Sequence, residues 1–180
     1  MSRKNTNQKK EFGDYQTPLN LSNEIMQVLK QEIKIPKTIL EPTCGVGNFV
    51  LAALDVFDRN KKIGKGSENQ DLRIYAYDIN KTYLSELKRN VPPGSKKVVS
   101  VEHRDFFKHN WKEELQKYEK PLLIVGNPPW VKSSTMSVLE GKNLPEKKNF
   151  KGEKGLAAIT GSGDFDISEW IILHLLEVMF

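Results

Sequence analysis

The sequence predicts an α/β fold built on a mostly parallel sheet. Short apolar segments rich in β-branched residues alternate with longer segments of helical periodicity, as strands and helices do in such folds. A glycine-bearing turn follows the first predicted strand, and polar residues stand at the ends of the later strands. At 180 residues the chain has the length of one domain and can bury a substantial core.

Composition limits the possible functions. The net charge of +5 fits an anionic partner such as nucleic acid. The single cysteine, Cys44, excludes an internal disulfide, and the three histidines lack metal-ligand spacing, so no metal site is expected. The sequence has no apolar run of about 18 residues and no signal-peptide pattern. We therefore expect a soluble, cytoplasmic protein without a membrane partner.

The N-terminal region contains a polar segment followed by a helix. Residues 1–11 are polar and basic without periodicity, so we expect a disordered tail. The sequence DYQTP at residues 14–18 then leads into apolar residues at helical spacing, residues 21–33. Either Asn20 or Ser22 is available as the N-cap of this helix.

The first strand and the turn after it form a candidate ligand cradle. Residues 38–40 are predicted as a strand, and the sequence EPTCGVGNF at residues 41–49 leads directly into the helical pattern of residues 50–57. In Rossmann-like folds the glycines of such a turn let the backbone approach a ligand, and the helix N-terminus offers N–H groups. Phe49 and Val50 stand where a dinucleotide fingerprint needs its third glycine, so NAD is disfavoured.

An acidic residue stands at the end of the second predicted strand. Residues 59–72 are a polar surface connection, and the strand at residues 73–77 ends in Asp78. A carboxylate at this position can accept hydrogen bonds from ribose hydroxyls. The alternative is that Asp78 caps the helix predicted at residues 81–90.

The third predicted strand, residues 98–102, also leads to a candidate ligand contact. Asp105 can accept from a purine amine, and Phe106 beside it can cover the face of the purine ring. One helical face before the next strand is apolar and consists of Trp111, Leu115 and Tyr118.

The fourth strand leads to the most specific candidate site. Residues 122–125 are apolar without interruption, which predicts a strand buried on both faces. Beyond its carboxyl end, where ligands bind in such sheets, stand Asn127 and Trp130. Pro128 and Pro129 restrict the geometry between them. Amide and carbonyl oxygens accept from an NH₂ group and indole offers a stacking face, so the expected ligand is a base with an exocyclic amine. The alternative is a proline turn whose tryptophan fills the core.

The rest of the sequence contains a long polar segment and an apolar helix. Residues 131–163 lack periodicity, which is typical of a mobile functional loop or of a disordered insertion. Their lysines can contact DNA phosphates, although a solvated loop is the simpler interpretation. Residues 164–166 are expected to cap an apolar helix, residues 167–180, that is buried on more than one side.

In this order the motifs resemble those of N6-adenine DNA methyltransferases of the gamma class, which includes many restriction-modification enzymes. The DYQTP, EPTCGVGNF and GNPPW sequences are similar to two cofactor motifs and the catalytic motif of that family, and FDISEW to the helix that follows. The resemblance implies a Rossmann-like, S-adenosylmethionine-dependent methyltransferase fold. Residues 12–180 then form the N-terminal part of the catalytic domain, with the first four strands of an incomplete sheet.

The resemblance also implies a cofactor site. S-adenosylmethionine would bind over the glycine turn, with Thr17 near its methionine end, Asp78 on the ribose and Asp105 on the adenine amine. The implied cofactor-binding residues are Thr17, Glu41, Pro42, Cys44, Gly45, Gly47, Asp78, Asp105, Phe106 and Asn127.

The implied reaction is direct methylation of the N6 amino group of adenine in double-stranded DNA. The target base would be rotated out of the duplex and stacked on Trp130. Asn127 and the Pro128 carbonyl would accept both N6 hydrogens, so that the nitrogen lone pair points at the methyl group. The implied catalytic residues are Asn127, Pro128, Pro129 and Trp130. No covalent intermediate is expected, because Cys44 has no evident role as a nucleophile.

The resemblance covers only part of the family's usual architecture. Further strands and a target-recognition domain normally follow the helix at residues 167–180. We therefore expect a fragment, or one half of a split enzyme, in which a second chain or a missing C-terminal half supplies the remaining strands and target recognition. The fourth strand would then be an edge strand.

Other functions remain open. Enzymes that methylate glutamine in protein or adenine in RNA also use Asn-Pro-Pro-aromatic, although Trp130 and the two cofactor motifs favour DNA. A non-catalytic, cofactor-binding fragment is a further alternative. Glu86-Leu87-Lys88 matches the E-x-K pattern of nuclease metal sites, but a solvated helix face explains it better.

Overall fold

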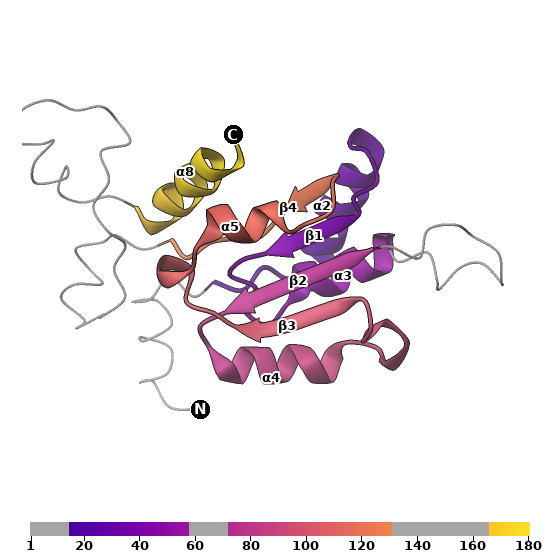
Figure 1. Ribbon diagram of the computed structural model, residues 1–180. Helices are drawn as coiled ribbons and strands as arrows, with labels where there is room; N and C mark the ends of the chain where they lie inside the picture. Colours follow the sequence, from indigo (N-terminus) through magenta and orange to yellow (C-terminus); the bar gives the residue numbers. More distant parts are fainter. Residues whose placement is uncertain (1–14, 58–71, 131–165) are drawn as a thin grey trace, which may run out of the picture. The chain divides into compact units, whose positions relative to one another are not determined.

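The computed structural model describes residues 15–57, 72–130 and 166–180, which Figure 1 draws in colour. The tail predicted at residues 1–11 and the loop predicted at residues 131–163 lie outside the described residues, as does all but the last residue of the connection at 59–72. Nothing described therefore tests these three predictions.

The described residues fall into two compact units. What we call the sheet unit comprises residues 16–106 and 117–127, as far as they are described. What we call the helical unit comprises the described residues among 1–15, 107–116 and 128–180. The predicted site residues are divided between them, with Asn127 in the sheet unit and Pro128 in the helical unit.

The described part of the sheet unit contains four parallel strands in the spatial order β3-β2-β1-β4 (Figure 1). The strands are β1 (Thr38–Glu41), β2 (Arg73–Asp78), β3 (Val99–His103) and β4 (Leu122–Ile124). β1 pairs with both β2 and β4, and β3 pairs with β2. The predicted α/β fold with a mostly parallel sheet is confirmed, although β3 begins one residue later than predicted.

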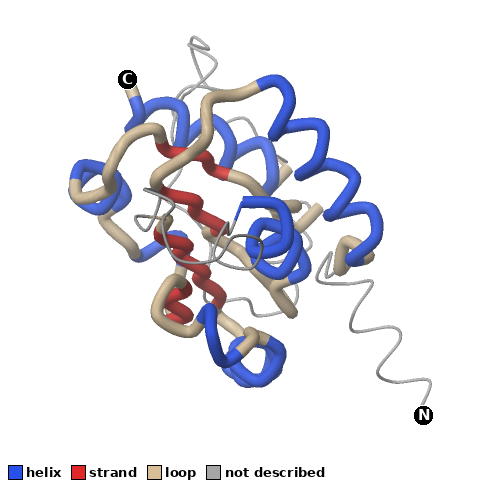
Figure 2. Tube along the Cα trace, turned by 90° about the vertical axis from the view of Figure 1, so that its right-hand side faces the viewer, coloured by secondary structure: helices blue, strands red, loops and turns tan. Residues whose placement is uncertain are grey.

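A hydrophobic core fills the space between this sheet and three helices. The helices are α2 (Leu19–Glu32), α3 (Asn48–Phe57) and α4 (Lys81–Asn90). Figures 1 and 2 show α2 and α3 side by side next to the strands. Because side chains alternate along a strand, Ile74 and Ala76 enter this core while Tyr75 and Tyr77 point to the opposite face of β2.

The start of α2 differs from the prediction. The helix begins at Leu19, and its N-cap residue is Pro18, which offers no side-chain hydrogen bond. Ser22 therefore does not cap the helix, and its hydroxyl instead donates to the Pro18 carbonyl at 3.2 Å. The prediction of Asn20 or Ser22 as the cap is wrong, because a proline already fixes the backbone at the helix entry.

The start of α4 decides between the two interpretations of Asp78. The N-cap is Asn80, whose side-chain oxygen accepts from the N–H groups of Thr82 and Tyr83. The alternative in which Asp78 caps this helix is therefore wrong. Asp78 lies two residues earlier, at the end of β2.

β4 differs from the prediction in its burial. All three of its residues are partly exposed, although an uninterrupted apolar sequence predicts burial on both faces. In the described structure β4 pairs with β1 alone and lies at the edge of the sheet. An edge strand leaves one row of backbone polar groups unpaired, which explains why its residues are less covered than those of β1.

The described residues of the helical unit include two helices, α5 (Trp111–Gln116) and α8 (Ile167–Met179), which contact each other. The ring of Phe107 meets that of Trp170 edge-on, with their centroids 5.5 Å apart. Asp166 caps α8 as predicted, because its Oδ1 accepts from the N–H of Ser168 at 2.9 Å.

α8 is buried on one side only, contrary to the prediction. Its buried apolar residues are Ile167, Trp170, Ile171 and Leu175, and its exposed ones are Ile172, Leu176 and Met179. The prediction relied on the apolar composition of the helix, which alone does not reveal how many neighbours cover it.

Two 3₁₀ turns complete the described elements, η2 (Pro93–Ser95) and η3 (Phe106–Lys108). The apolar face predicted from residues 111–118 is buried, but α5 ends at Gln116. Tyr118 therefore lies beyond the helix, in the sheet unit, where its hydroxyl is hydrogen-bonded to that of Tyr77 at 2.7 Å.

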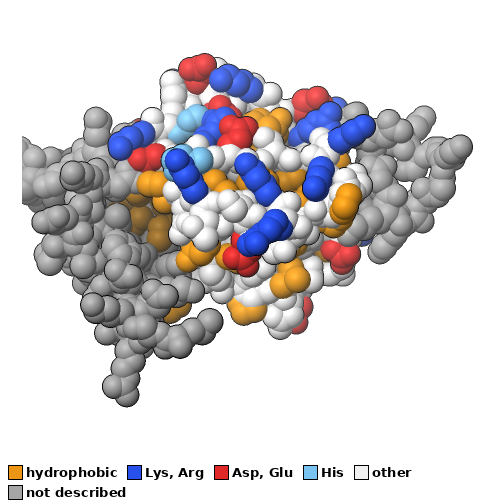
Figure 3. Space-filling view, turned by 90° about the horizontal axis from the view of Figure 1, so that it is seen from below, with side chains coloured by type: hydrophobic (Ala, Val, Ile, Leu, Met, Phe, Trp, Pro, Cys, Tyr) orange, Lys and Arg blue, Asp and Glu red, His pale blue; other side chains and the backbone are white. Residues whose placement is uncertain are grey.

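The α4 side of the sheet unit carries charges of both signs (Figure 3). Lys81, Lys88 and Arg89 are exposed and Glu86 is half-buried. The E-x-K sequence at residues 86–88 is part of this mixed face, and the described residues contain no group of three or more His, Cys, Asp or Glu that could hold a metal ion. None of the described helices is both long and apolar enough to cross a membrane.

Candidate functional site

The C-terminal ends of the parallel strands bring the predicted polar residues to one edge of the sheet unit. Glu41 is the last residue of β1, and Asp78 is the last residue of β2. Asp78 pairs with His103, which ends β3, and Asp105 and Phe106 follow. Residues far apart in the sequence are therefore gathered by the topology of the sheet.

The turn after β1 contains two glycines with left-handed backbone. The φ angle is +54° at Gly45 and +82° at Gly47, which L side chains rarely adopt. A Cβ atom at Gly47 would lie 2.6 Å from Leu87 Cδ2, and one at Gly45 would lie 2.7 Å from Gln16 Nε2. In the structure these glycines make room for neighbouring segments of the chain, and their predicted role in making room for a ligand stays a prediction.

The DYQTP segment lies against the same turn. The backbone N–H of Val46 donates to Gln16 Oε1 at 3.0 Å, and the side-chain amide of Asn48 donates to the Thr17 carbonyl at 2.7 Å. Thr17 thus lies beside the turn. Sequence reasoning did not single out Gln16 and Asn48. The signal in the sequence was that DYQTP and EPTCGVGNF each contain an amide side chain, which can hydrogen-bond to the backbone of the other motif.

Asp78 is oriented by two backbone amides. Its Oδ2 accepts from the N–H of Gly45 and its Oδ1 from the N–H of Asn80, both at 2.7 Å. The N–H of Cys44 also donates to the Tyr77 carbonyl at 2.8 Å, so the turn is tied to the end of β2 at two points. These bonds fix the direction of the carboxylate, which a ligand-binding group requires.

Glu41 places a buried carboxyl group beneath the turn. The residue is 3% exposed, and its Oε2 accepts no hydrogen bond from the part of the chain that is described. Burial raises the pKa of Glu41 well above the ordinary value of 4.5, the N–H of Val50 lowers it, and the charge of Asp78 raises it. A buried acceptor without a donor costs free energy, so its presence here favours a ligand-binding role.

The end of β4 brings Asn127 to the same edge. The N–H of Val125 donates to the Leu40 carbonyl at 3.0 Å, which continues the pairing with β1. Gly126 then lies against Glu41, because a Cβ atom on Gly126 would be 3.5 Å from Glu41 Cγ. Asn127 follows and is half-buried. The amide predicted to be catalytic therefore comes directly after a residue that lies beside the Glu41 side chain.

The other residues of the predicted catalytic motif belong to the helical unit. Trp130 is 57% exposed in the structure. An indole that filled a core would be nearly inaccessible, so the alternative interpretation of Trp130 as a core residue finds no support in the described residues. The stacking role of Trp130 stays a prediction.

Comparison with known proteins identifies the family. A model of the N-6 DNA Methylase family matches residues 1–179. The chain belongs to the N-6 DNA methylase family. Its parallel α/β sheet agrees with the Rossmann-like methyltransferase fold that the motifs implied.

Two relatives of this family member are Type II methyltransferases. M.NspV of Nostoc sp. (strain ATCC 29411 / PCC 7524) is 39% identical over 171 residues, and M.VspI of Vibrio sp. (strain 343) is 29% identical over 141 residues. The matches cover 95% and 77% of this chain, but 33% and 28% of the two relatives. The chain therefore spans about a third of the length of the relatives it matches.

Two apolar side chains near the ends of β2 and β3 differ in exposure in this N-6 DNA methylase chain. Phe106 is 6% exposed, so its ring is covered by protein, whereas Ile79 is 51% exposed directly after Asp78. The carbonyl of Ile79 is hydrogen-bonded to the His103 ring nitrogen Nε2 at 3.0 Å. Sequence reasoning missed Ile79, although an apolar residue beside a polar strand end is a signal for the wall of a flat ligand site.

Cys44 has the environment of a structural cysteine. Its side chain is buried. Burial raises the pKa of the Cys44 thiol, as do the nearby carboxyl groups of Glu41 and Asp78. The thiolate is the reactive form of cysteine, so this environment agrees with the expectation that Cys44 is no nucleophile.

We predict that iodoacetamide modifies Cys44 at least about 100-fold more slowly in the folded chain than in the urea-unfolded chain, because each unit of raised pKa lowers the thiolate population tenfold. The measurement is the rate of mass increase at about pH 8, where an ordinary cysteine is partly ionised. The unfolded chain is the control, since it contains the same single thiol. Equal rates in the two states would contradict the burial of Cys44.

Proposed function

We propose that this chain forms the cofactor-binding and catalytic part of an S-adenosylmethionine-dependent enzyme that methylates the N6 amino group of adenine in DNA. The observation that carries the proposal is the convergence of a buried carboxyl, an oriented carboxylate and an amide motif at the C-terminal edge of one parallel sheet, in a member of the N-6 DNA methylase family. The names of both relatives support a role in restriction-modification.

The residues around the glycine turn fit S-adenosylmethionine. This cofactor carries positive charge and hydrogen-bond donors, and Glu41 and Asp78 lie close enough for the charge of Asp78 to raise the pKa of Glu41. A cationic ligand stabilises the ionised form of Glu41 beside Asp78, and a donor from the ligand satisfies the buried Oε2 of Glu41. When bound, the cofactor supplies an electrophilic methyl group.

Individual residues of the chain then have distinct roles in holding the cofactor. Asp78 accepts from the ribose hydroxyls, and the amides of Gly45 and Asn80 keep its carboxylate in position. Asp105 accepts from the adenine amine, and Ile79 covers the ring. Thr17, held by Asn48, lies at the methionine end.

Asn127 and Pro128 prepare the target amine for attack. The exocyclic nitrogen of adenine is a weak nucleophile because its lone pair is delocalised into the ring. The side-chain oxygen of Asn127 and the carbonyl of Pro128 accept its two hydrogens, which favours the geometry in which the lone pair faces the methyl group. Trp130 holds the rotated base by stacking, worth roughly 1–3 kcal/mol against an unstacking cost of a few kcal/mol.

The test is incubation of the chain with methyl-labelled S-adenosylmethionine and mixed-sequence duplex DNA, followed by base analysis. The expected product is N6-methyladenine. Label in protein glutamine or in RNA adenine, offered in parallel, would reject the DNA assignment. Cofactor binding without any transfer would reject catalysis by this chain and favour the non-catalytic, cofactor-binding function.

Glu41→Gln is predicted to make the stability of the chain less dependent on pH. The pKa of Glu41 is raised in the folded state, so its contribution to stability is fully present below about pH 4.5 and is lost as pH rises through the folded-state value. Glutamine has the same shape but does not ionise. The variant should therefore gain stability relative to the natural chain as the pH rises above about 4.5, the ordinary pKa of a glutamate.

Urea denaturation at several pH values measures this difference. Glu86→Gln is the matched control, because it makes the same chemical change on α4, at a half-buried residue outside the candidate site. A constant offset between Glu41→Gln and the natural chain across the whole pH range would contradict the prediction. The same variant should bind S-adenosylmethionine more weakly, since it lacks the charge that attracts the cation.

A further inference from the structure

The end of β3 contains an arginine that neither the sequence motifs nor the proposed chemistry uses. Arg104 lies between the last residue of β3 and Asp105. Its backbone N–H donates to the Asp78 carbonyl at 3.0 Å. Arg104 therefore connects the end of β2, with Asp78, to the segment that contains Asp105.

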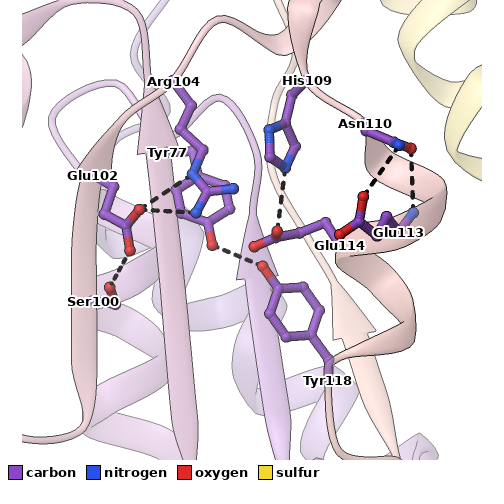
Figure 4. A network of polar contacts seen from close by, with 9 residues as sticks. All are labelled: Tyr77, Ser100, Glu102, Arg104, His109, Asn110, Glu113, Glu114 and Tyr118. Carbon is purple, nitrogen blue, oxygen red and sulfur yellow. Dashed lines mark hydrogen bonds and ion pairs between the residues drawn. The ribbon is translucent and has the colours of Figure 1, made fainter.

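The side chain of Arg104 is held from two directions (Figure 4). Its Nε and Nη2 donate to Glu102 Oε2 at 3.2 and 2.8 Å, and its guanidinium carbon lies 4.2 Å from the centroid of the Tyr77 ring. Hydrogen bonds to a carboxylate and a cation–π contact are both favourable, and a planar guanidinium makes them at once. An arginine fixed in this way differs from a solvated surface arginine.

The two groups that hold Arg104 are themselves fixed. Glu102 Oε1 accepts from the hydroxyl of Ser100 at 2.8 Å. Tyr77 is 1% exposed, and its hydroxyl is hydrogen-bonded to that of Tyr118, whose ring stacks on Tyr75. The guanidinium thus rests on a chain of contacts that spans β2 and β3, and its position is determined by the sheet rather than by the flexible strand end.

We propose that Arg104 is a positioning residue that holds Asp105 at a fixed place relative to Asp78, and thereby gives the site its preference for a purine with a 6-amino group. The inference rests on the proposed function, in which Asp105 accepts from that amine. A carboxylate discriminates between an amine and a carbonyl oxygen only if it cannot move away from the wrong group. This role requires no contact between Arg104 and the cofactor.

The experiment compares the binding of S-adenosylhomocysteine and S-inosylhomocysteine. The second ligand has a 6-oxo group in place of the 6-amino group, and its N1 carries a hydrogen. The natural chain should prefer the amine. Arg104→Lys keeps the positive charge but loses the planar guanidinium. It should lower the preference, measured as the dissociation constant of S-inosylhomocysteine divided by that of S-adenosylhomocysteine, at least about threefold, because small misplacements of a binding group are costly. Glu102→Gln should lower the ratio in the same direction.

Arg73→Lys is the matched control, because Arg73 is an exposed arginine at the opposite end of β2 and should leave the ratio unchanged. If Arg104→Lys weakens both ligands equally, or leaves the ratio unaltered while the natural chain discriminates, the positioning role is wrong. If the natural chain binds neither nucleoside, the proposed cofactor site itself is wrong, and the two failures are thus distinguishable.

Discussion

Asn127→Ala is expected to lower the rate of methyl transfer by roughly 10²–10⁴-fold, the range found when a group that acts on the reacting atoms is removed. The side-chain oxygen of Asn127 is the acceptor that orients the target amine in the proposed mechanism, and alanine provides none. Cofactor affinity should fall far less than the rate, because the carboxyl groups of Glu41 and Asp78 are retained. The measurement is label incorporation into adenine at saturating cofactor, together with the cofactor dissociation constant.

Two further variants test whether the loss of activity comes from the loss of the acceptor oxygen at position 127. Asn127→Asp keeps acceptor oxygens at the same position and should lose less activity than Asn127→Ala. Asn90→Ala removes an exposed asparagine at the end of α4 and should transfer at the natural rate. An alanine variant that transferred as fast as the natural chain would remove Asn127 from the mechanism.

Gly47→Ala is expected to destabilise the fold by about 2–5 kcal/mol. The left-handed backbone at Gly47 accounts for about 1–2 kcal/mol of this, the usual cost for an L residue in that region. Crowding against Leu87 adds about 1–3 kcal/mol, as in other overpacked cores. Urea denaturation of the variant and of the natural chain measures the total loss in the free energy of unfolding.

The controls separate these two costs. Gly94→Ala should change stability by less than about 0.5 kcal/mol, because a Cβ atom at Gly94 would meet no other atom within 4 Å. In a double-mutant cycle, Leu87→Ala should make Gly47→Ala less costly than it is in the natural chain, since the crowded side chain is gone. Strictly additive effects would show that Leu87 is not the obstacle.

The elements that could be predicted from the sequence are those that depend on local patterns. The strand at residues 73–78 with its terminal Asp78, the helix at residues 81–90 and the cap at Asp166 follow from apolar periodicity and from the chemistry of capping residues. The α/β class follows from the order of such segments. Each of these predictions needs only residues within a few positions of one another.

Predictions that needed a neighbour from elsewhere in the chain were incomplete or wrong. Residues 122–125 have the composition of a strand buried on both faces, yet all three residues of β4 are partly exposed. The helix α8 is apolar, yet one side of it is exposed. An apolar sequence indicates that burial is favourable, but it does not indicate which segment packs against it.

The candidate site shows the same division. The candidate groups could be chosen from the sequence, because the chemistry of carboxyl, amide and glycine residues at strand ends is their own. How these groups are held depends on tertiary contacts. Gln16 bonds to Val46, Gly47 makes room for Leu87, and Arg104 joins the ends of β2 and β3. The physical reason is that such contacts join residues tens of positions apart, and their geometry is fixed by strand register and packing, which no local pattern encodes.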